Sequence, residues 1–481
     1  MSDKRLFFSV VIILCNAIVS TNFLFASNSP EMLPKNVRAV LKHRGLPPSS
    51  LSAYVVNLDN NEVLLSWNPS EPRSPGSVMK LFTTASALDI LGPTFQWNTE
   101  FYVNGLIEDQ ILNGDLIIKG YGDPYLTSEN IWKMLKRLKQ KGIKGITGDL
   151  LLDDSYFFHP NYDPSSFDKE PLRAYNVGPN SLMFNFKSVR FYIEADKENN
   201  NIRIIADPEL DNIKIINKLK LVEGECEGYQ RGIRLVVNKR YDRLSFRGTF
   251  PESCEDFSLY RSLLTHNEYT YGMFKSIWHQ IGGEFTGKWK NTINSDKGEP
   301  FFINKSETLS FVISKINKHS NNSMSRNLLF TLAAEKYLSP ANEEKGRKVV
   351  HEWLRQNNIN TNGFYLDNGS GLSRNARLTA EQTVELLIYA YNSPFMPEFL
   401  SSLSLAGLDG TMLERFEDDL LTGKLHIKTG SIDHVNSIAG YLYSRSGKRY
   451  AFAVIQNYKN IHNGFGEELQ EALLRWLYDE L

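Results

Sequence analysis

The chain has 481 residues, of which 41% are hydrophobic and 23% are charged, a composition typical of globular proteins with ample material for a core. Its length corresponds to two or three domains of common size. With 54 basic residues, 55 acidic residues and a formal net charge of −1, it lacks the basic excess of nucleic-acid-binding proteins, and no nucleic-acid partner is expected.

The N-terminal segment has the layout of a secretory signal peptide. Two basic residues precede an apolar stretch from Leu6 to Val19, and small residues follow it. We predict a signal peptide over residues 1–26, cleaved near Ala26, and a periplasmic mature protein. The alternative is an uncleaved anchor. No later run is long enough to span a bilayer, so no stable membrane span is expected after cleavage.

The next elements are a helix, two strands and a second helix. Residues 30–45 predict a short helix, and residues 51–68 predict two strands joined by a turn. Ser77 opens the next helix, whose apolar residues follow the helical period. Gly92-Pro93 ends that helix.

Residues 97–275 differ in character from the segments on either side. Short strands alternate with turns, and one helical segment, residues 129–142, interrupts them. This pattern predicts one or two inserted β-rich domains. The flanking segments, residues 27–96 and 276–481, are then one discontinuous domain.

Two cysteines remain in the predicted mature chain, Cys226 and Cys254. The segments between them predict a hairpin that turns near Arg240-Tyr241, and the two cysteines are equally distant from that turn. Because exported proteins keep disulfides, we predict that the two are joined. The alternative is two separate thiols.

The C-terminal part returns to helices and then to strands. Helical patterns occupy residues 307–320 and 323–338, and another helix begins at Ala380. Three strands and a final amphipathic helix follow, at residues 423–432, 437–444, 448–457 and 466–481. We predict an α+β fold in which the first and last strands share one antiparallel sheet, with the final helix packed on the sheet.

Ser77 and Lys80 are candidates for nucleophilic chemistry, because this spacing at a helix start points both side chains to one face. A serine hydroxyl is a weak nucleophile until a base removes its proton, and a partly desolvated lysine can be that base. Free backbone N–H groups at the helix start suit an oxyanion. The pair predicts acyl transfer without histidine. The alternative is an N-cap serine followed by a solvated lysine.

The same spacing recurs at Ser166 and Lys169. This copy lies among prolines and acidic residues, with no apolar helix behind it. We predict a surface loop there, without a catalytic role.

A second hydroxyl and a carboxamide occur in Ser320-Asn321-Asn322, in the predicted loop before a helix. They suit the relay of a proton and the binding of a substrate amide. Ser325 to Asn327 has the same spacing, but an apolar run follows directly and places it within the helix. We therefore prefer Ser320 and Asn322.

Lys428-Thr429-Gly430 lies on a predicted strand. A lysine and a hydroxyl suit the capture of a carboxylate, and the glycine permits close backbone approach. We expect Lys428 to be exposed at the strand edge, so that its loss affects turnover more than stability. The alternative is an ordinary strand end.

Together, these motifs form the Ser-x-x-Lys, Ser-x-Asn and Lys-Thr-Gly set of penicillin-recognising enzymes. The chain most closely resembles the D-alanyl-D-alanine carboxypeptidase/endopeptidase family of low-molecular-mass penicillin-binding proteins. The resemblance covers nearly the whole mature chain and includes GYGDPYL, DNGSGLSR, LAGLDGTMLERF and the long insertion. It implies a transpeptidase-like or β-lactamase-like domain, an antiparallel sheet between helices, with inserted β-rich domains.

The resemblance also implies roles for individual residues. Ser77 is the acylated nucleophile and Lys80 its base, while Ser320 shuttles a proton with Lys428 nearby. The other assigned residues bind substrate: Asn322 holds the peptide bond, Thr429 and Ser431 hold the terminal carboxylate beside Gly430, and the N–H groups of Ser77 and Ser431 form the oxyanion hole. Arg326 departs from the family, which often carries an acidic residue near this position.

The function implied is that of a serine DD-peptidase, which acts on peptidoglycan stem peptides as a carboxypeptidase, a crosslink endopeptidase or both, and which β-lactams inhibit covalently. A serine β-lactamase is the alternative, but the Glu-x-x-Leu-Asn pattern that would position a hydrolytic water is absent. A wall-binding protein with a lost active site is a third possibility, against which the intact motifs argue. Neither Gly-x-Ser-x-Gly nor a His-x-x-x-His pair occurs, and no cofactor is expected.

Overall fold

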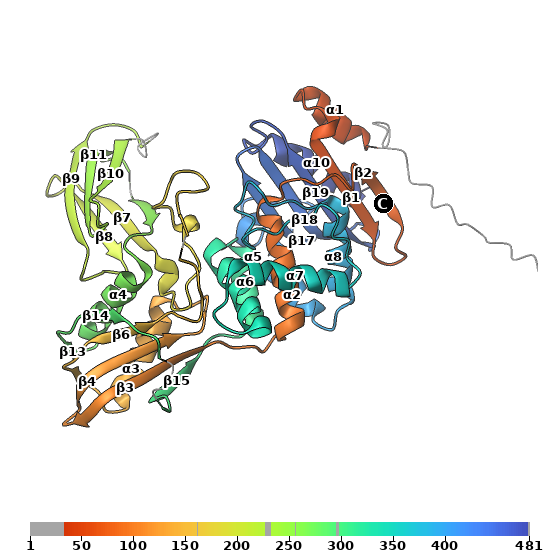
Figure 1. Ribbon diagram of the computed structural model, residues 1–481. Helices are drawn as coiled ribbons and strands as arrows, with labels where there is room; N and C mark the ends of the chain where they lie inside the picture. Colours follow the sequence, from red (N-terminus) through yellow and green to blue (C-terminus); the bar gives the residue numbers. More distant parts are fainter. Residues whose placement is uncertain (1–32, 161, 227–231, 255, 295–297, 480–481) are drawn as a thin grey trace, which may run out of the picture.

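The computed structural model describes residues 33–479 except 161, 227–231, 255 and 295–297. The predicted signal peptide lies outside the described residues. Figure 1 shows two parts: the first and last segments of the chain form one, which contains α2 and α10, and the middle segment forms the other, which contains β3 and β9.

A six-stranded antiparallel sheet organises the first part, and it contains the first and last strands of the chain, as predicted. Its spatial order is β16-β17-β18-β19-β1-β2. The strands are β1 (Leu51–Asn57), β2 (Val63–Trp67), β16 (Ser404–Leu405), β17 (Leu425–Ile432), β18 (Val435–Tyr443) and β19 (Arg449–Asn457).

Helices cover both faces of this sheet, so nearly every residue of the central strands β18 and β19 is buried. One face packs against α1 (Lys35–His43) and α10 (Phe465–Asp479), in a core that includes Val37, Ile438 and Leu473. The other face shares a core with six further helices, and this core includes Phe82, Leu328 and Ala439. These helices are α2 (Lys80–Leu91), α5 (Leu309–Lys318), α6 (Asn322–Tyr337), α7 (Glu343–Gln356), α8 (Ala380–Asn392) and α9 (Met396–Ser402).

The middle segment forms three further sheets around a core of its own. The largest has seven strands: β3 (Asn98–Glu108), β4 (Ile111–Gly120), β5 (Gly145–Ile146), β6 (Leu150–Asp153), β13 (Glu284–Phe285), β14 (Trp289–Asn291) and β15 (Phe302–Lys305). The two three-stranded sheets are β12-β7-β8 and β10-β11-β9, built from β7 (Val189–Asp196), β8 (Asn201–Asp207), β9 (Lys214–Val222), β10 (Ile233–Val237), β11 (Arg243–Pro251) and β12 (Asp256–Arg261).

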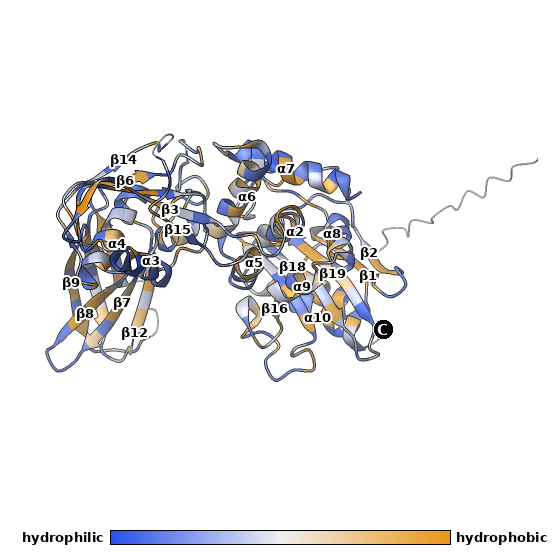
Figure 2. Ribbon diagram, turned by 90° about the horizontal axis from the view of Figure 1, so that it is seen from below, coloured by the Kyte–Doolittle hydropathy of each residue, from blue (hydrophilic) through white to orange (hydrophobic). Residues whose placement is uncertain are grey.

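Two helices accompany these sheets, α3 (Ser128–Gln140) and α4 (His266–Gln280). The first matches the predicted helical segment, and Figure 2 shows how hydrophilic it is outside its buried apolar stripe. The second was not predicted, because buried residues occur on most of its circumference and leave no simple apolar stripe.

The pairing of the short strands after α4 bears on the domain boundary. The expected boundary after residue 275 falls inside α4, and β13, β14 and β15 pair with β5, β6 and β3 of the middle segment. Strands of only two to four residues carry little periodicity, so the sequence did not reveal them. We propose that the inserted region extends to Lys305.

The hairpin predicted between the two cysteines is present, with β10 and β11 antiparallel and Ile233 opposite Gly248. The sulfur atoms of Cys226 and Cys254 are bonded in the structure. Within the part of the chain that is described, no helix has both the length and the apolar character that a membrane crossing requires.

Candidate active site

Ser77 lies in a single 3-10 turn, Gly76–Met79, that runs directly into α2. The helix proper therefore begins at Lys80, three residues later than predicted. The turn and the helix are continuous, so the two side chains still meet: Nζ of Lys80 lies 3.0 Å from Oγ of Ser77.

Lys80 is fully buried and also contacts two carbonyl oxygens, the side-chain Oδ1 of Asn322 and the backbone oxygen of Ser370, each at 2.6 Å. Burial lowers the pKa of Lys80 well below its ordinary value, and the positive charges of Lys428 and Arg326 lower that pKa further. A neutral amine is thereby favoured.

Once Lys80 is neutral, these three contacts use its whole valence. Carbonyl oxygens only accept hydrogen bonds, so Asn322 and Ser370 take both N–H groups of a neutral Lys80. The lone pair is then left for the one partner that can donate, the hydroxyl of Ser77. The geometry therefore suits proton transfer from Ser77 to Lys80.

Lys428 on β17 faces the same site from the sheet. Its Nζ donates to Oγ of Ser320, at 3.1 Å, and to the carbonyl oxygen of Thr429, at 2.8 Å. The expectation that Lys428 is exposed is wrong: its exposed fraction is 0%, because helices cover the sheet. This burial lowers the pKa of Lys428 to about 7.

The turn before α6 brings Ser320 and Asn322 to the site. Ser320 adopts a positive φ of 53°, and Asn321 caps α6 by accepting from the N–H of Met324. Asn322 is thus the first residue of the helix and not part of the preceding loop. The competing pair lies inside α6, where Ser325 donates to the carbonyl oxygen of Gly369.

The 3-10 turn of Ser77 lies against β17. A Cβ on Gly430 would come within 2.4 Å of the carbonyl oxygen of Pro75 and 2.8 Å of the nitrogen of Ser77. A Cβ on Gly76 would lie 3.3 Å from the nitrogen of Ser431. Only glycine allows this approach, and it gathers the backbone nitrogens of Ser77 and Ser431 at one place.

Two residues near the site were not predicted individually, although the motifs that contain them were noted. Ser370, in DNGSGLSR, supplies the carbonyl oxygen that Lys80 contacts. Thr411, in LAGLDGTMLERF, places its Oγ1 2.9 Å from Oγ1 of Thr429. Sequence spacing gives no sign of either contact, since Ser370 lies 290 residues from Lys80 and Thr411 lies 18 residues before Thr429, outside its strand.

Arg326 contacts the inserted region. Its Nη1 donates to the carbonyl oxygens of Tyr175 and Val177, at 3.0 and 2.7 Å. The side chain is buried, and no carboxylate of the described residues lies within ion-pair distance of it. Arg326 therefore ties α6 to a loop of the insertion and adds positive charge near Lys80.

The second Ser-x-x-Lys is outside this constellation. Ser166 and Lys169 are both exposed in a run of turns with no helix behind them.

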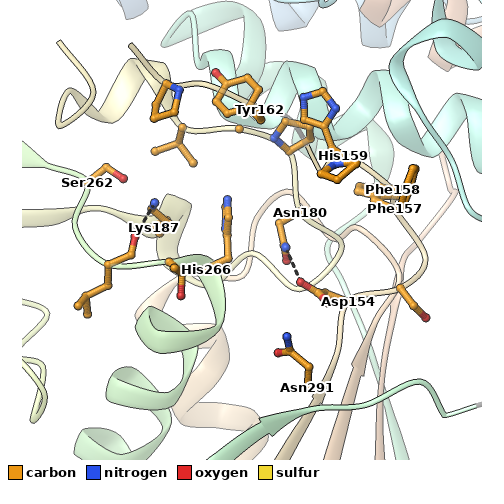
Figure 3. A pocket seen from close by; sticks show the side chains of 18 of the residues that line it. Asp154, Phe157, Phe158, His159, Tyr162, Asn180, Lys187, Ser262, His266 and Asn291 are labelled. Atoms are coloured by element: carbon orange, nitrogen blue, oxygen red, sulfur yellow. Dashed lines mark hydrogen bonds between the residues drawn. The ribbon is translucent and has the colours of Figure 1, made fainter. Parts of the chain in front are cut away.

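A cavity of about 710 Å³ lies nearby in the inserted region and is lined by none of the predicted catalytic residues. Figure 3 shows its polar lining, in which Asn180 donates to Asp154 and Lys187 donates to the carbonyl oxygen of Leu264.

Comparisons with known proteins agree with the resemblance read from the motifs. Residues 33–479 match the model of the D-Ala-D-Ala carboxypeptidase 3 (S13) family. The chain belongs to this family. S13 proteins are serine-type D-Ala-D-Ala carboxypeptidases, so the chain is a hydrolase of the penicillin-binding class.

Individual relatives match over most of their length. The D-alanyl-D-alanine carboxypeptidase DacB of Haemophilus influenzae is 27% identical over 418 residues, which cover 86% of each chain. A D-alanyl-D-alanine carboxypeptidase of Actinomadura sp. is 24% identical over 88% of this chain and 81% of its own.

The fold of a solved penicillin-binding protein is also similar. Crystal structures of the Haemophilus influenzae penicillin binding protein 4 (dacB), one of them complexed with a novel β-lactam, match with TM-scores of 0.78 and 0.73 at 24% identity. Each covers 92% of this chain and 99% of its own. The predicted fold class is thus confirmed: a transpeptidase-like sheet between helices, with β-rich insertions.

Proposed function

We propose that the protein is a periplasmic serine DD-peptidase, which cleaves D-alanyl peptide bonds of peptidoglycan stem peptides through an acyl-enzyme on Ser77. The observation that carries the proposal is the buried Lys80 amine, which lies 3.0 Å from the Ser77 hydroxyl while two carbonyl oxygens take its N–H groups. Such an amine is a general base for a serine nucleophile.

The proposed first step transfers the Ser77 proton to Lys80 as Oγ attacks the carbonyl carbon of the penultimate D-alanine. The N–H groups of Ser77 and Ser431 stabilise the oxyanion. The C–N bond then breaks, and the leaving amine takes the proton that Lys80 accepted, passed on through Ser320, which Lys428 contacts. Water finally hydrolyses the ester and regenerates Ser77.

Substrate recognition is assigned to the edge of β17 and the start of α6. Thr429 and Ser431 bind the terminal carboxylate, and the Asn322 amide binds the peptide bond. Terminal trimming, cleavage of crosslinks, or both, are within this chemistry, because each breaks a bond on the carboxyl side of a D-alanine. A β-lactam acylates the same serine and blocks the site.

Steady-state hydrolysis of a short D-Ala-D-Ala peptide, measured beside hydrolysis of a β-lactam, tests the proposal. We expect turnover of the peptide and a long-lived stoichiometric adduct with penicillin. Rapid β-lactam turnover without peptidase activity would indicate a β-lactamase instead. Neither reaction would indicate a wall-binding protein.

A further inference from the structure

A cleft beside the predicted active site takes one wall from the inserted region. The site candidates Ser320 and Asn322 line this cleft, of about 450 Å³, together with residues of the β12-β7-β8 sheet. From that sheet the cleft takes Arg190 and Tyr192 on β7, Asp207 on β8 and Tyr260 on β12. A peptide that extends from the predicted active site into this cleft would meet this sheet.

The sheet presents its polar face to the cleft. Val189, Phe191 and Ile193 of β7 are buried in the core of the insertion. Side chains alternate along a strand, so Arg190 and Tyr192 point to the opposite face. Tyr260 is directly opposite Arg190 on β12 and is 51% exposed. The rings of Tyr192 and Tyr260 thus flank the guanidinium of Arg190 on this face.

Arg190 is held in place but is not neutralised. Its guanidinium carbon lies 4.2 Å from the ring centre of Tyr192 and 5.4 Å from that of Tyr260. One nitrogen donates to Oγ of Ser258, at 3.1 Å, whereas the buried Nε has no hydrogen-bond partner. Asp207 is opposite Arg190 in register on β8, yet the arginine turns towards β12, and no carboxylate of the described residues pairs with it.

An arginine in this state is suited to one class of ligand. A stacked guanidinium without an ion-pair partner can bind a carboxylate through its terminal nitrogens, with charge-assisted hydrogen bonds. The N-terminus of α6, at Asn322 and Ser323, lines the same cleft and adds partial positive charge. The cleft beyond the catalytic residues therefore favours an anionic group over a neutral one, although it also contains Asp207.

We propose that Arg190 binds a carboxylate of the stem peptide upstream of the scissile bond, and so selects for acidic stems. This inference rests on the proposed function, because it extends the same cleft. The terminal D-alanine carboxylate is assigned to Thr429 and Ser431, so Arg190 recognises a different group. Its role is to bind and orient the donor stem.

The test compares variants of Arg190 on two substrates. Stem pentapeptides with free upstream carboxylates, and the same peptides with these carboxylates amidated, are compared on the full chain and on Arg190→Gln. For the free-acid peptide we expect kcat/KM to fall by roughly tenfold or more, mainly through KM, because a charged hydrogen bond is lost. For the amidated peptide we expect less than about a twofold change, and Arg190→Lys should recover part of the loss.

Arg203→Gln is the matched control, since Arg203 is on the same sheet but pairs with Glu194 at 2.8 Å and does not line the cleft. The Arg203→Gln variant should leave kcat/KM unchanged for both substrates. Equal losses on both peptides in Arg190→Gln, or no loss on either, would overturn the assignment.

Penicillin acylation and turnover of a short D-Ala-D-Ala peptide by the unaltered protein are measured first. Their absence would refute the proposed function, and this inference with it, and is thus distinguishable from a failure at Arg190 alone.

Discussion

Lys80 Nζ lies 3.0 Å from Ser77 Oγ, and the lysine side chain is completely buried. Its two other contacts, to Asn322 and Ser370, come from residues 242 and 290 positions further along the chain. The base is therefore positioned by three separate segments, and only its contact with Ser77 is local. The predictions below test what this arrangement implies.

Ser77→Ala should abolish the covalent penicillin adduct, and Ser166→Ala should leave it intact. Lys169, beside Ser166, is exposed to solvent in a run of turns, whereas Lys80 is buried beside Ser77. Intact-mass measurement and peptide mapping after penicillin treatment check both variants. A penicilloyl group on Ser166, or full labelling of Ser77→Ala, would contradict the functional proposal.

Lys80→Arg should reduce acylation by roughly 10²- to 10⁴-fold, the usual contribution of a general base. Arginine keeps its charge and has no lone pair to accept the Ser77 proton. Lys169→Arg is the matched control from the other Ser-x-x-Lys copy and should behave like the unaltered protein. Rates of penicillin acylation decide the comparison, and near-normal rates in Lys80→Arg would rule out the base role.

The free energy of unfolding should rise with pH between about 7 and about 10.5. The folded protein releases the Lys428 proton at about pH 7, whereas the unfolded chain holds it up to the ordinary value of 10.5. The unfolded state then binds more protons in this window, so stability increases with pH. Urea unfolding of Lys428→Met across this range should give a shallower slope, by up to one proton. An unchanged slope would mean that Lys428 stays charged in the fold.

Gly430→Ala should slow penicillin acylation by about a hundredfold or more, because a displacement of order 1 Å at reacting groups has that effect. The added Cβ would meet backbone atoms of Pro75 and Ser77 at 2.4 and 2.8 Å and push the turn away from β17. Gly145→Ala is the control, since its Cβ would meet a side-chain carbon of Ile111 at an ordinary 3.4 Å. Equal rates in both variants would show that the close approach is not needed.

The mature chain should contain no free thiol, because Cys226 and Cys254 are joined. Thiol titration of the denatured, non-reduced protein checks this, and two titratable thiols would be incompatible with it. Replacing both cysteines by serine should lower the free energy of unfolding by about 2–4 kcal/mol, since the crosslink restricts the unfolded chain.

Local patterns predicted elements where periodicity is strong and failed where it is weak. The strands β1, β2, β17, β18 and β19 of the six-stranded sheet and the helix α3 were predicted because alternation or an apolar stripe extends over many residues, whereas the two-residue β16 was not predicted. Helix α4 was missed although Thr265 and Glu268 form a capping box that is visible in the sequence. The strands β13, β14 and β15 pair with strands that lie far away in the sequence. Strands this short carry no sequence pattern that predicts their partners.

The sequence by itself determined the chemistry available to this protein: three motifs in order, the spacing that puts Ser77 and Lys80 on one face, and the family to which they belong. Tertiary structure determined the pKa values of the two site lysines, Lys80 and Lys428. Lys428 was expected to be exposed, and packing of helices on both sides of the sheet buries it and lowers its pKa to about 7. Desolvation depends on what covers a side chain, and the atoms that cover Lys80 and Lys428 come from segments hundreds of residues apart.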